Sequence, residues 1–186
     1  MKHVFTGMFV LALAVPSADA QMAQGAPQTI SLAAGLQRSY EGIKRNLTEM
    51  AEKMAEADYS FMTTKDVRTF GQLMGHAANA QFNACSAARG MANPNQGNDN
   101  EKKANKAEFV KALADSFAFC DDAFKALTDA SAVEMVKQGQ NSVARGSVLA
   151  NLIAHSNEVY GTAIPYMRMK GLVPPSTERN TRKPGL

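Results

Sequence analysis

The sequence predicts an all-α protein, a four-helix bundle with a long crossover between the second and third helices. Four long stretches have apolar residues at every third or fourth position, the spacing that lines one face of an α-helix. We find no strand candidate. The link over residues 91–104 is longer than a hairpin between antiparallel helices requires, so it can return the chain to the starting end of the bundle.

Composition predicts one globular domain. The chain has 186 residues, of which 45% are hydrophobic and 20% charged, enough for one core and too few to expect two domains. The net charge of +3 is small, and part of it comes from Arg179, Arg182 and Lys183 near the C-terminus. We therefore expect no nucleic-acid partner.

Residues 1–20 have the pattern of a secretory signal peptide. Lys2 and His3 precede an apolar run over residues 4–15, and small residues follow up to Ala20, after which cleavage is predicted. A run of about 12 residues is shorter than the roughly 20 that a membrane-spanning helix needs. We expect an exported protein, periplasmic or secreted, with no membrane association after cleavage and a flexible leader over residues 21–28.

The helical bundle is expected over residues 29–176. Its first helix is predicted to begin at Thr29 or Ser31 and to end at Ala57, with charged residues on its outer face. The expected inner face consists of Leu32, Leu36, Tyr40, Ile43, Leu47, Met50 and Met54. Residues 58–68 break the helical period and predict an ordered loop at one end of the bundle.

Thr69 and Gln72 have the spacing of a capping box, which predicts that the second helix begins there. This helix is expected to run to Arg89, where Gly90 ends it. The expected inner face consists of Phe70, Leu73, Met74, Ala77, Ala80 or Gln81, and Ala84. His76 lies beside this face, so the pattern leaves the direction of its side chain open.

The third helix is predicted to begin at Asn105, which with Glu108 repeats the capping spacing. Its apolar stripe consists of Phe109, Val110, Leu113, Phe117, Cys120, Phe124 and Leu127. A further short helical piece is expected over residues 128–137. The last long helix is expected from Ser142 or Ser147 to Lys170, followed by a proline-containing segment that cannot continue helically and a flexible tail over residues 177–186.

The two cysteines provide a test of the topology. Cys85 lies 16 residues after Thr69, and Cys120 lies 15 residues after Asn105. In parallel helices these cysteines lie at the same height, within reach of a disulfide, whereas in an antiparallel hairpin they lie about 15 Å or more apart along the axis. Two buried free thiols remain the alternative.

The two histidines outside the signal peptide are the candidate site. Asn151, His155 and Val159 are four residues apart and share one face of the last helix. Two histidines at this spacing would form half of a zinc site, but the later position here is valine. Taken alone, His155 and His76 are also compatible with hydrogen-bonded histidines at the edge of the core.

The segments VRTFGQLMGH at residues 67–76, HSNEVYG at 155–161 and YMRMKGLVPPS at 166–176 resemble the DinB family, in particular its exported members. The resemblance implies a four-helix bundle with a long crossover. It also implies a divalent metal, nickel or zinc, held by three histidines, whose positions match His76, His155 and Val159. Relatives include thiol-dependent transferases and proposed metal-dependent hydrolases.

Val159 departs from this pattern because its side chain supplies no ligand. Asn79, Asn151 and Glu158 are the residues that could supplement the two histidines, although an asparagine is a weak ligand for either metal. One hypothesis is therefore an exported metal-dependent hydrolase or thiol transferase that acts on a small molecule. The alternative is a non-catalytic bundle that binds a small ligand or a partner. A homodimer is compatible with either hypothesis.

Overall fold

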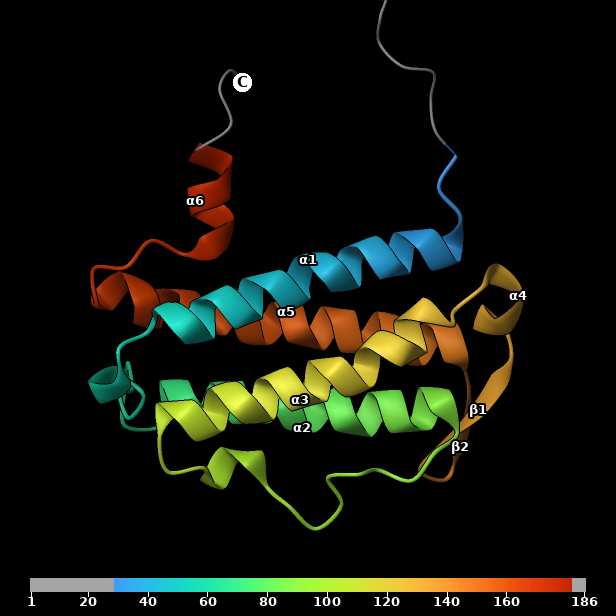
Figure 1. Cartoon of the computed structure of the whole chain (residues 1–186), viewed down its shortest axis with the longest axis horizontal. Coiled ribbons are helices and arrows are strands. Elements are labelled where there is room, and N and C mark those ends of the chain that lie inside the picture. Colours follow the sequence, from blue (N-terminus) through green and yellow to red (C-terminus); the bar gives the residue numbers. More distant parts are fainter. Residues whose placement is uncertain (1–28, 182–186) are drawn as a thin grey trace, which may run out of the picture.

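The computed structural model describes residues 29–181, and the predicted signal peptide, leader and residues 182–186 lie outside this range. Four long helices form the bundle: α1 (Leu32–Lys53), α2 (Phe70–Arg89), α3 (Lys106–Lys125) and α5 (Arg145–Met169) (Figure 1). The predicted all-α bundle is confirmed. Within the described range, no helix is long and apolar enough to cross a membrane.

The helix starts predicted from capping residues are confirmed. Thr69 and Gln72 form the reciprocal capping box of α2, and the side chain of Asn105 caps α3 by accepting from the backbone of Glu108. Because α1 ends at Lys53, its predicted end at Ala57 is too late; the 3₁₀ turn η2 (Glu56–Asp58) follows. Leu32, expected on the inner face of α1, is 57% exposed.

The helical piece predicted over residues 128–137 is wrong beyond Ala132. A short helix, α4 (Asp129–Ala132), is followed by a β-hairpin of β1 (Met135–Gln138) and β2 (Asn141–Ala144). Gly139 adopts a φ of 61° in the two-residue connection, the left-handed conformation that tight hairpin turns need. The expectation that the chain has no strand is therefore corrected.

The expectation of a non-helical C-terminal segment is also wrong. Helix α6 runs over Pro175–Thr181, and proline suits the first turn of a helix because the amide hydrogen it lacks has no partner there. The hydroxyl of Tyr160 donates to Ser176 Oγ and accepts from its backbone N–H. The ion pair between Lys53 and Glu178 ties α6 to the end of α1.

Helices α2 and α3 are parallel, as the crossover prediction requires. Near their N-termini, a Cβ added at Gly71 would lie 2.5 Å from the ring of Phe109, so the two helices are in close contact there. The disulfide between Cys85 and Cys120, with a Cα–Cα distance of 5.3 Å, joins them further along. Residues 90–105, which include the 3₁₀ turn η3 (Asn100–Lys102), return the chain along the bundle (Figure 1).

The core lies among the four helices, and polar contacts at its edge link α1 to α3. The ring of Tyr40 stacks on Phe124 with centroids 3.9 Å apart, and its hydroxyl donates to Asp121 Oδ1 at 2.8 Å. Burial, followed by the hydrogen bond to Asp121, raises the pKa of the Tyr40 phenol far above its ordinary value. Burial likewise raises the pKa of Tyr59, whose hydroxyl donates to Ala51 O.

Removing the disulfide tests the parallel arrangement. We expect the double substitution Cys85→Ala and Cys120→Ala to lower the free energy of unfolding by about 4 kcal/mol, because the closed loop no longer restricts the unfolded chain. Urea denaturation followed by circular dichroism measures the change. A loss of stability below about 1 kcal/mol, or two titratable thiols in the unreduced protein, would contradict the disulfide between the parallel helices α2 and α3.

Alkaline titration tests the two buried phenols. An unfolded tyrosine ionises near pH 10. Since folding raises the pKa of Tyr40 and Tyr59, the stability that their neutral forms provide is present below pH 10 and lost as the pH rises above it. Of the four tyrosines, we therefore expect these two to ionise only as the helices unfold. The appearance of four tyrosinates at 295 nm near pH 10, with helicity intact, would refute this.

Candidate functional site

The two candidate histidines meet between α2 and α5. The ring centroids of His76 and His155 are 4.9 Å apart with an interplanar angle of 69°, an edge-to-face contact. Their side chains are 28% and 33% exposed, so the pair lies at the edge of the core and remains open to solvent. The direction of His76, which the sequence left open, is thus toward α5.

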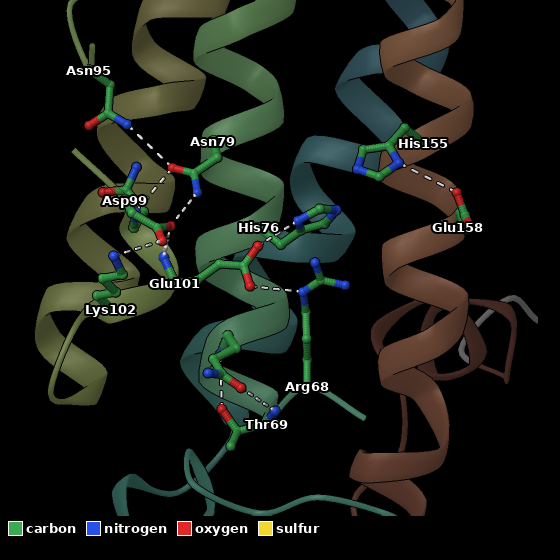
Figure 2. A network of polar contacts seen from close by, with 12 residues as sticks. Arg68, Thr69, His76, Asn79, Asn95, Asp99, Glu101, Lys102, His155 and Glu158 are labelled. Atoms are coloured by element: carbon green, nitrogen blue, oxygen red, sulfur yellow. Dashed lines mark hydrogen bonds and ion pairs between the residues drawn. The ribbon is translucent and has the colours of Figure 1, made fainter. Parts of the chain in front are cut away.

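Glu101, in the crossover, fixes the orientation of His76. The Nδ1–H group of His76 donates to Glu101 Oε1 at 2.7 Å, and Arg68 Nε donates to the other carboxylate oxygen at 2.8 Å (Figure 2). Because a carboxylate can only accept, the proton of this hydrogen bond belongs to Nδ1, which leaves Nε2 of a neutral imidazole as a free lone pair. Metal-binding histidines commonly have such a carboxylate partner.

His155 has a looser acidic partner on its own helix. Its Nδ1 lies 3.4 Å from Glu158 Oε2, and the Glu158 side chain is 75% exposed. In Figure 2 the two imidazoles face one another, with Glu101 and Glu158 on their outer sides. Two imidazoles that share an ion at roughly 2.1 Å from each nitrogen would have centroids about 5 Å apart. The spacing of the pair suits two ligands of one metal.

The crossover packs closely against α2 beside His76. A Cβ at Gly75 would lie 2.3 Å from the carbonyl oxygen of Asn100, so only glycine permits this approach. Asn79 Oδ1 accepts from the backbone of Asn100 at 3.1 Å, and its amide donates to Asp99 Oδ1 at 2.9 Å. Asp99 in turn accepts from the backbone N–H of Glu101, and this contact, with the Asn79 bond, lowers the pKa of Asp99. These contacts fix the position of Glu101 beside His76.

The residues that were expected to supplement the histidines do not complete a metal site. The side chain of Asn79 is engaged by the crossover, Asn151 is exposed to solvent, and Glu158 lies at the outer nitrogen of His155. Val159 is buried at 4% exposure. Within residues 29–181, no group of three or more histidine, cysteine, aspartate or glutamate side chains is arranged to hold a metal. The residues present do not fit a three-ligand centre.

The family model that describes the DinB superfamily matches residues 39–163, most of the chain and both histidines. The chain belongs to the DinB superfamily. This agrees with the resemblance seen in the sequence and with the parallel α2 and α3 of the bundle. No curated protein matches the chain.

Solved structures support the same fold. A DinB-like protein from Bacillus cereus is 15% identical, with a TM-score of 0.61 over 76% of this chain and 94% of that one. A conserved protein from Enterococcus faecalis is also 15% identical, with a TM-score of 0.60 over 74% and 96% of the two chains. At this identity the likeness concerns the fold alone.

A pair of glycine substitutions tests how the crossover is held. Gly75→Ala should lower the melting temperature and free the crossover, since the new Cβ collides with Asn100. We expect a loss of about 1–3 kcal/mol, in the range of an overpacked contact. In Gly42→Ala, the matched control within α1, the Cβ has no heavy atom within 4 Å, so alanine should raise stability by up to about 1 kcal/mol. Equal effects of the two substitutions would contradict the close contact.

Proposed function

We propose that this protein is an exported DinB-superfamily bundle that binds a small ligand or a partner and holds no resident catalytic metal. The observation that carries the proposal is the buried Val159, one helical turn after His155, where the family pattern has its third ligand. A divalent transition metal needs about three protein ligands for a firm site, and only two imidazoles converge here. Metal bound to this pair is expected to exchange readily.

Export is part of the proposal. It is supported by the signal-peptide pattern of residues 1–20 and by the disulfide between Cys85 and Cys120, since disulfides persist mainly in oxidising compartments. The mature protein would begin at residue 21. N-terminal sequencing of the protein from a secreting host tests the predicted cleavage.

The second candidate is a metal-dependent hydrolase or thiol transferase that acts on a small molecule. It is favoured by one observation, the carboxylate that holds His76 through Nδ1 while its ring packs against that of His155. Such a partner commonly accompanies a histidine that binds metal. In this reading nickel or zinc would be held by the two histidines and by solvent.

Restoring the missing ligand separates the two candidates. We expect protein purified without an affinity tag to contain much less than one equivalent of nickel or zinc. Val159→His should bind one equivalent, at least about tenfold more tightly than the wild type, because three imidazoles can then surround the ion. Elemental analysis and calorimetric titration measure both quantities.

The matched control is Val159→His combined with His155→Ala, which carries the same new imidazole but again only two ligands. It should return to weak binding, and circular dichroism checks that each variant folds. The wild type could instead contain stoichiometric nickel or zinc that is lost in both His76→Ala and His155→Ala. This result would contradict the proposal and support the second candidate.

A further inference from the structure

A cavity of about 410 Å³ lies where α2 and α3 end, beside α4 and the start of α5. Its lining includes two arginines, Arg89 of α2 and Arg145 of α5, together with Asp122 and the apolar residues Ala126 and Leu127. Its volume falls within the range of small-molecule sites, roughly 300–1,000 Å³. It shares no residue with the histidine pair.

Both guanidinium groups are held in place by the backbone. Arg89 Nη1 donates to the carbonyl of Phe119 at 2.9 Å, and its Cζ lies 4.6 Å from the centroid of the Phe119 ring. Arg145 donates through Nη1 to the carbonyl of Ala88 and through Nε to that of Ser131. The two side chains are only 22% and 26% exposed. Their positive charges are therefore fixed in the wall of the cavity before any ligand arrives.

The acidic partners of these arginines are exposed. Asp122 lies 3.1 Å from Arg89 Nη2 with a side chain that is 66% exposed, and Glu134 lies 2.8 Å from Arg145 Nη2 with one that is 59% exposed. Because only the carboxylate of each ion pair is exposed, water screens these interactions in part, and Asp122 itself lines the cavity beside Arg89. A guanidinium also carries more N–H groups than these contacts use. An incoming carboxylate would bind the N–H groups that remain, or displace Asp122 and Glu134 from the arginines.

Part of the lining of the cavity is apolar. Leu127 is buried at 4% exposure, whereas Met91, which also lines the cavity, is 52% exposed. The C-terminal ends of α2 and α3 and the N-terminal end of α5 all lie beside this region, so the partial charges of the helix ends are of both signs. Two arginines that are each already paired with one carboxylate, next to apolar residues, suit a ligand with a single negative charge and an apolar body.

We infer that this cavity binds a small organic monocarboxylate, with its carboxylate on Arg89 and Arg145 and its apolar part against Ala126 and Leu127. Arginine suits this role because its planar fork of donors matches the two carboxylate oxygens. The inference is independent of the metal question, so its failure leaves the account of the histidine pair unchanged.

Benzoate is a suitable probe. In ¹H–¹⁵N spectra of the mature chain, we expect benzoate to shift the resonances of Arg89, Ala126 and Leu127 in a saturable manner. Arg89→Gln should weaken the affinity at least about tenfold, since the ligand loses one charged partner. Ala126→Phe fills the cavity from an exposed position and should abolish the shifts, even if the arginine variant fails to fold.

Lys111→Gln is the matched control, because it removes one positive charge from α3 at a side chain that is 74% exposed and outside the cavity. It should leave the affinity unchanged. Inorganic phosphate at the same concentration should not displace benzoate. The absence of saturable shifts, an undiminished affinity in Ala126→Phe, or equal binding of phosphate would each overturn the inference.

Discussion

The close contact between the crossover and α2 is the constraint on which the candidate site depends. Because α2 and α3 are parallel and joined by Cys85 and Cys120, the chain must travel back along the bundle between them. Gly75 lets the Asn100 carbonyl approach the helix, and this approach brings Glu101 within 2.7 Å of the His76 ring. The loop is thus a structural part of the site, which explains why one helix alone does not define the orientation of His76.

The parts of the fold that were predicted correctly are encoded locally. Thr69 and Asn105 begin helices through side-chain contacts three residues away, and the height of the two cysteines follows from their distance to these caps. The hairpin was missed because four-residue strands are too short for a clear alternation, and Gly139 ends a helix as plausibly as it makes a turn. Glu101 was missed because its contact with His76 is set by the path of the crossover.

The histidine pair has the carboxylate partner and the ring spacing that suit a metal, but it lacks a third protein ligand. Glu101 holds His76, and the two rings are spaced as two ligands of one ion would be, yet buried Val159 supplies no third ligand. The spacing of His155 and Val159 made this visible from the sequence alone, whereas the engagement of Asn79 by the crossover required the structure. The carboxylate partner also stabilises the crossover, which gives it a role that does not depend on metal.

The tautomer of His76 is the most direct test of whether the crossover orients this histidine. Long-range ¹H–¹⁵N correlation spectra of the imidazoles near pH 8 distinguish a proton on Nδ1 from one on Nε2. The wild type should show His76 protonated on Nδ1, with an unprotonated Nε2, and Glu101→Ala should lose this preference because the carboxylate that holds the proton is gone. A wild-type His76 protonated on Nε2, or an unchanged Nδ1 tautomer in Glu101→Ala, would contradict the role given to the crossover.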